Sequence, residues 1–90
     1  MEVKIVCGDQ MKIADIRVVA ETIEEKCECV AVAAVEEMFP EYDCVVYEQK
    51  ESANASPELR NAIIGIRNDE GGIIYCDVLV AADFKEVVIV

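Results

Sequence analysis

Apolar residues recur at alternating spacings of three and four between Ile13 and Ala34, and this repeat limits the possible folds more than any other feature of the chain. Its members are Ile13, Ile16, Ala20, Ile23, Cys27, Val30 and Ala34, and Val19, Ala31, Val35 and Met38 widen the same stripe. Such spacing is typical of one side of an amphipathic helix. The repeat therefore predicts one helix from about Asp9 to Phe39, with Asp9 as its N-cap and Pro40 beyond its end.

A second interpretation divides the same stretch at Thr22. Thr22 and Glu25 form a capping box, which is a sequence signal for a helix N-terminus. Residues 11–20 would then be a strand that pairs with residues 2–7 through a turn at Gly8. The unbroken helix would hold roughly 30 residues and measure about 45 Å, which is long for a domain of this size. We prefer the continuous or kinked helix, and the hairpin stays open.

The other apolar runs are short and rich in branched side chains, so they predict strands. They are residues 2–7, 42–49, the two halves of 61–81 on either side of 68–72, and 84–90. Residues 57–69 could instead form a helix capped by Ser56, although three isoleucines in that stretch favour a strand. The polar segment 50–58 predicts a loop.

These elements predict one α+β domain over residues 1–90. In the preferred order, β-α-β-β-β-β, one long helix packs on a curved antiparallel sheet of four to five strands. The hairpin alternative gives β-β-α-β-β-β-β. The preferred order resembles the cystatin-like layout, in which a sheet grips one helix. The resemblance concerns topology alone and implies no function.

The chain also carries signs of its compartment. Of its 90 residues, 54% are hydrophobic and only 6% aromatic, so the core must consist mainly of Val, Ile, Ala and Cys. Neither a signal peptide nor an apolar run of the roughly 20 residues that span a bilayer is apparent. Five cysteines without a secretion signal fit reduced thiols. We therefore expect the cytoplasm, of a bacterial cell or of a host cell if the gene is viral.

The net charge of −11 is concentrated in one part of the chain. Residues 21–51 contain ten acidic residues against Lys26 and Lys50, which gives −8. Nucleic acids and anionic membranes are bound through clustered Lys and Arg, so neither is an expected partner. A basic protein surface is the partner that such a charge favours.

Several kinds of catalytic site are poorly supported. The chain has no histidine, so it lacks the usual general base and the commonest metal ligand. Cys27 and Cys29 are spaced as C-x-C, and on a helix their side chains point to opposite sides, which disfavours a shared metal ion. Cys27 belongs to the apolar stripe and is expected in the core. We expect no enzymatic activity, no metal and no cofactor.

The candidate binding surface is the side of the helix away from the apolar stripe. We predict that its residues are Glu21, Glu25, Glu28, Cys29, Val32 and Glu36. A purely solvated side does not require Cys29 and Val32, whereas a protein contact commonly has an apolar centre and a polar rim. The alternative is an ordinary solvated helix side, since single exposed valines are common.

Two functions from different classes follow. The first is a non-catalytic acidic interaction protein that binds and inhibits a basic, nucleic-acid-binding protein. In its charge it resembles small acidic phage proteins that mimic nucleic acid or inhibit host defence. The second is a homo-oligomer that binds or sequesters a small molecule between subunits. Its support is the C-terminal strand, residues 84–90, which has apolar residues on both sides and so could be covered by another copy.

Overall fold

The computed structural model describes residues 1–49, 59–67 and 71–90. Its elements are β1 (Glu2–Cys7), β2 (Gln10–Asp15), α1 (Ile23–Met38), β3 (Asp43–Gln49), β4 (Leu59–Arg67), β5 (Ile73–Ala81) and β6 (Glu86–Ile89). The α+β class is confirmed. The preferred order with one strand before the helix is wrong, and the hairpin alternative β-β-α-β-β-β-β is confirmed.

The predicted start of the helix at Asp9 is wrong, because Gly8 and Asp9 form a turn. Gly8 has a φ of 62°, which suits a tight turn rather than a helix, and Asp9 lies in that turn instead of capping a helix. All six residues of β2 pair with β1. Consequently Ile13 and Val19, which the repeat placed in the core, are 57% and 80% exposed. Periodicity alone did not distinguish a strand followed by a helix from one long helix.

The helix begins where the capping box predicted. Thr22 is the N-cap, and its Oγ1 accepts a hydrogen bond from the backbone N–H of Glu25 at 3.1 Å. The Glu25 carboxylate accepts in turn from the N–H of Glu21 at 3.0 Å. At the other end the N–H of Phe39 donates to Val35 O at 2.8 Å, and Pro40 follows. The sixteen residues of α1 are therefore about half the length first predicted.

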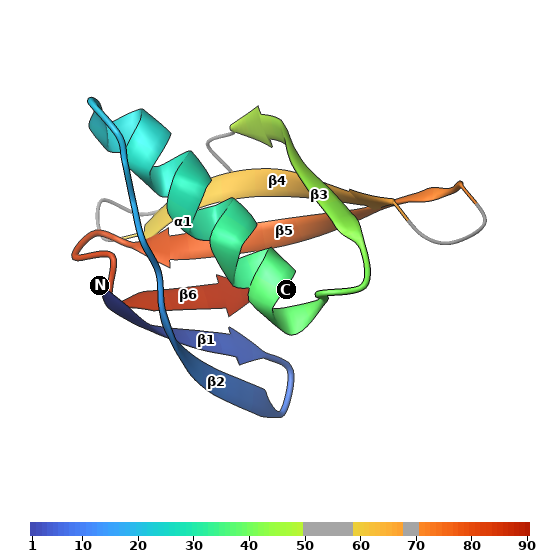
Figure 1. Cartoon of the computed structure of the whole chain (residues 1–90), viewed down its shortest axis with the longest axis horizontal. Coiled ribbons are helices and arrows are strands. Elements are labelled where there is room, and N and C mark those ends of the chain that lie inside the picture. The colour runs from blue at the N-terminus through green and yellow to red at the C-terminus, as the bar shows by residue number, and fades with distance from the viewer. Residues whose placement is uncertain (50–58, 68–70) are drawn as a thin grey trace.

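The strands form a six-stranded sheet in the order β2-β1-β6-β5-β4-β3 (Figure 1). Neighbouring strands are antiparallel except β1 and β6, which are parallel. The predicted fully antiparallel sheet of four to five strands is therefore wrong in both respects. The C-terminal strand inserts between β1 and β5, a pairing of distant segments that no local pattern in the sequence reveals.

The helix lies across one face of the sheet, and the core fills the space between them (Figure 1). The buried residues that the structure describes come from α1, from β2, from alternate positions of β1, β5 and β6, and from the segments that follow β2 and precede β6. They are Val3, Ile5, Ala14, Ile16, Cys27, Val30, Ala31, Ala34, Val35, Cys76, Val78, Val80, Phe84, Val87 and Ile89. The expected core of small and branched side chains is confirmed.

The remaining predictions concern residues 50–72, of which the structure describes only a part. The alternative helix over residues 57–69 is wrong for residues 59–67, which form β4. Gly71, at the end of the predicted turn between the two strands, has a φ of 81°. The predicted loop at 50–58, with Ser56, lies outside the described residues.

Candidate protein-binding face

The six residues predicted as a binding surface lie at the start of α1 and along its side away from the sheet. We call Glu21, Glu25, Glu28, Cys29, Val32 and Glu36 the acidic face. Glu21, Glu25, Cys29 and Glu36 are exposed, whereas Glu28 and Val32 are half-buried. Val32 also packs against the edge of the core. The helix therefore brings these residues to one side, although two of them are less accessible than the sequence suggested.

Cys27 and Cys29 confirm the predicted division of the helix into two sides. Cys27 is fully buried, while Cys29 is exposed and its thiol lies 4.0 Å from the backbone oxygen of Val19. Residues two apart on a helix are rotated by about 200° from each other. These two thiols therefore cannot share a ligand.

The carboxylates of the acidic face lack cationic partners within the described residues. The two ion pairs found there join Lys12 to Glu37 and the N-terminal amine to Asp15. Lys26, the one lysine of α1, instead places its Nζ 4.5 Å from the centroid of the Phe84 ring. Within the part of the chain that the structure describes, the negative charge of the face is therefore not neutralised by an ion pair.

This charge arrangement does not favour helix stability at every position. Glu24 and Glu25 in the first turn interact favourably with the helix dipole. Glu36 lies in the last turn, which contains no basic residue, and there a negative charge is unfavourable. Glu24 and Glu28 are four residues apart and repel each other by a few tenths of a kcal/mol. Acidic residues that only kept the protein soluble could lie at positions where they do not destabilise the helix. Solubility alone therefore does not explain these positions.

Glu25 has a structural role as well. Its carboxylate accepts the N–H of Glu21 and completes the capping box. Replacing it would change both the charge of the face and the start of the helix. Glu28 and Glu36 accept no such bond from the described residues, so they are better positions for testing the face.

Val19 is an exposed apolar residue that the sequence interpretation missed. The helical repeat predicts it in the buried stripe. In the structure it lies in the connection between β2 and α1, beside Cys29 and 80% exposed. Val19, Cys29 and Val32 thus supply apolar surface among the carboxylates. No signal other than the capping box at Thr22 could have placed Val19 outside the helix.

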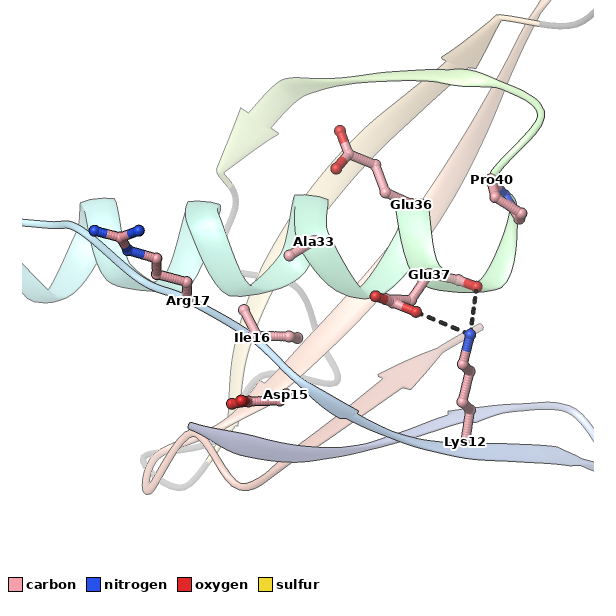
Figure 2. Close-up of a pocket in the computed structure, with 8 residues that line it drawn as sticks. All are labelled: Lys12, Asp15, Ile16, Arg17, Ala33, Glu36, Glu37 and Pro40. Atoms are coloured by element: carbon pink, nitrogen blue, oxygen red, sulfur yellow. Dashed lines mark hydrogen bonds and ion pairs between the residues drawn. The ribbon is translucent and has the colours of Figure 1, made fainter.

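A groove of about 340 Å³ borders the face, between α1 and the end of β2 (Figure 2). Its lining residues come from both sides: Lys12, Asp15, Ile16, Arg17, Ala33, Glu36, Glu37 and Pro40. Figure 2 shows Lys12 and Arg17 at opposite ends of the groove. The Lys12 ammonium contacts the Glu37 carboxylate at 2.9 Å and the Glu37 backbone oxygen at 3.5 Å. Lys12 therefore supplies the positive charge that the last turn of α1 lacks.

A second hollow, of about 440 Å³, lies near the start of the helix. Met1, Arg17, Val18, Ala20 and Lys26 line it. Arg17 and Lys26 give this hollow a positive character that contrasts with the acidic face. It could receive a small anion with an apolar part, because Val18 and Ala20 supply the apolar walls.

None of the described cysteines forms a disulfide, and their thiols differ in burial. Burial raises the pKa of the Cys76 thiol, and the neighbouring Cys7 thiol raises it further. Cys76 is thus a poor nucleophile at neutral pH. In the parts of the chain that the structure describes, no three Cys, Asp or Glu side chains lie close enough together to hold a metal ion. The side chain of Cys44 lies outside that description.

Comparisons with protein-family models, with curated proteins and with solved structures found no significant match to this chain. Among the described residues, no helix is both long enough and apolar enough to cross a bilayer.

Proposed function

We propose that the protein is a non-catalytic interaction protein of the cytoplasm, whose acidic face binds and inhibits a basic, nucleic-acid-binding protein. The observation that carries the proposal is the row of carboxylates along α1 that have no cationic partner among the described residues. That the described cysteines form no disulfide supports a reducing compartment.

The geometry of the acidic face is more typical of a protein-binding surface than of an ordinary solvent-exposed side of a helix. Glu25 and Glu36 are eleven residues apart, so the carboxylates extend over about 16 Å of helix. Between them lie Cys29 and Val32, with Val19 beside them. An apolar centre with a charged rim is the usual anatomy of a protein interface. The carboxylates would mainly raise the association rate and exclude wrong partners, while the apolar centre would slow dissociation.

Inhibition follows from the type of surface that such a face fits. A groove that binds nucleic acid presents Lys and Arg at the positions of the phosphates. Glu28 and Glu36 could pair with those cations in place of the phosphates. Nucleic acid and this protein would then compete for the same groove.

The test uses two variants with equal net charge. Glu28→Lys with Glu36→Lys changes the acidic face, and Glu2→Lys with Asp9→Lys changes exposed acids of the β1–β2 hairpin. Each pair raises the formal charge by four, from −11 to −7. Wild type and both variants are used to capture proteins from a lysate of the source organism, and the captured proteins are identified by mass.

The proposal predicts a basic protein that wild type and the hairpin variant retain and the helix variant loses. Purified, that protein should release its nucleic acid when the wild-type chain is added. If both variants lose the partner equally, net charge and not this face determines binding. If the helix variant keeps the partner, the binding site lies elsewhere.

A second candidate function is small-molecule binding, favoured by the hollow that Arg17 and Lys26 share. Its ligand would be a small anion with an apolar part. Isothermal titration with a series of carboxylates of increasing chain length would detect it, and Arg17→Ala should weaken any binding at least tenfold, the loss of one charge-assisted hydrogen bond. No heat from any member of the series would leave the interaction protein as the single proposal.

A further inference from the structure

The face of the sheet opposite α1 carries a row of apolar side chains that no other described element covers. The pairing register aligns Met11 with Val6, Val6 with Val88, and Val88 with Leu79. Residues paired in this way project from the same face of a sheet. The row therefore crosses four adjacent strands, β2, β1, β6 and β5, without a charged residue. We call Met11, Val6, Val88 and Leu79 the outer row.

The outer row is distinct from the core. Val87 and Ile89, the alternate residues of β6, are buried under α1. Val6, Val88 and Leu79 are only half-buried, and Met11 is 57% exposed. Ile13, on the same face of β2, is exposed to the same extent. An open apolar row at the centre of a sheet indicates a contact with another molecule.

The charges beside this row identify the occupant. Lys4 and Glu86 are paired in register on β1 and β6, and both are exposed on the outer face. They lie two residues before Val6 and Val88 on the same strands. A two-fold axis that runs parallel to the strands, between β1 and β6, exchanges these two strands. It would place Lys4 opposite Glu86 of the partner subunit, and Glu86 opposite Lys4 of the partner subunit.

The same axis matches the apolar residues. Val6 would meet Val88 of the partner subunit, and Met11 would meet Leu79 of the partner subunit. Charged and apolar residues of the outer face thus both match across the axis, as an isologous interface requires. We propose that a second copy of this chain packs on the outer face, so that two sheets lie face to face between two outer helices.

The size and charge of the chain allow this arrangement. This axis overlays four strands of each subunit, β2, β1, β6 and β5. Four strands about 4.8 Å apart, over about 20 Å of β1, give a projected face of roughly 380 Å². Its side chains make the accessible area larger, yet the interface stays below the ~800 Å² per partner of a standard complex, which suits a dimer with a micromolar Kd. The acidic face lies on the helix side, so the dimer would keep the two acidic faces apart. The dimer would also leave both acidic faces open to partners.

The first experiment measures the molar mass of the full chain by light scattering. The proposal predicts twice the monomer mass of 9.9 kDa at a protein concentration of about 50 μM, where a dimer with a micromolar Kd is mostly assembled. Val88→Lys, which places a charge in the outer row without entering the core, should give the monomer mass with unchanged circular dichroism. A wild-type chain that is monomeric at this concentration would overturn the proposal.

The second experiment tests the axis. Lys4→Glu and Glu86→Lys each place like charges opposite one another across the dimer, so each should weaken self-association at least tenfold. Mixing the two variants restores opposite charges at both contacts, and a heterodimer should form with nearly wild-type affinity. Within each variant chain, residues 4 and 86 carry like charges before and after mixing, so only a contact between chains can explain recovery. A wild-type dimer without heterodimer formation would place the interface elsewhere and contradict the proposal.

Discussion

The outer side of α1 and the outer face of the sheet are both exposed, yet their side chains differ in kind. Along the helix, carboxylates surround Cys29 and Val32 and lack cationic partners in the described structure. On the sheet, an uncharged row lies beside Lys4 and Glu86, which are opposite charges in register. A surface with charge of one sign can be complementary only to a different molecule. A surface with both signs in register can be complementary to itself.

The inner and outer sides of α1 should differ most in their tolerance of a charge. Val30→Asp would bury a carboxylate at a fully enclosed position and cost several kcal/mol, a large part of the stability of a small domain. Val32→Asp, two residues later and half-buried, should cost about 1 kcal/mol. Urea unfolding measures both. Equal losses would show that the acidic face is part of the core rather than a surface.

The capping box tests whether the helix starts where the structure places it. Thr22→Ala removes the acceptor for the N–H of Glu25 and should cost about 1 kcal/mol in urea unfolding. Thr22→Ser keeps a hydroxyl oxygen at the same place and should cost much less. If α1 continued N-terminally through Thr22, as the apolar repeat predicted, alanine would instead be neutral or stabilising.

The two ends of α1 should respond with opposite sign to the same change. Glu24→Lys puts a positive charge in the first turn and should destabilise the fold by about 0.5 kcal/mol. Glu36→Lys puts it in the last turn, which has no basic residue, and should stabilise by a similar amount. Chemical denaturation at low salt measures both. A stabilised Glu36→Lys variant that has lost its partner would show that the face costs stability for the sake of binding.

The smallest expected change in stability concerns Asp15, at the end of β2. The N-terminal amine donates to Asp15 Oδ1 at 2.7 Å and holds the pKa of that carboxyl below its ordinary value. A lowered folded pKa stabilises the fold above the unfolded pKa of about 4, and the contribution is lost as pH falls through the folded pKa. Asp15→Asn should therefore be slightly less stable than wild type at pH 6 and equal to it near pH 2. A difference that persists at low pH would need another cause.

The sequence predicted the helix interior better than its start. Cys27 and Val30 were assigned to the core and are buried, because their spacing matches the helical period over the part that is helical. Ile13 and Val19 matched the same period by coincidence, and tertiary pairing of β2 with β1 decided their places. Thr22 and Glu25 carried the correct local signal, which the longer repeat outweighed in the preferred interpretation.

The sheet could be predicted only in part. The strand character of residues 2–7 and 73–81 follows from branched side chains and alternation. The insertion of β6 beside β1 depends on contacts between the two ends of the chain, which no local pattern encodes. The acidic face was found from the helical wheel, since its residues are close in sequence. The outer row joins four strands, and it became visible only once their register was known.

The dependence of partner affinity on salt tests the acidic face most directly. The Kd of the isolated complex is measured from about 50 to about 300 mM salt. Over this range the Debye screening length falls from above about 10 Å to below it. The account predicts a Kd that rises at least tenfold across this range, and a much weaker dependence for the Glu28→Lys, Glu36→Lys variant. A Kd that stays constant with salt would contradict binding through these carboxylates.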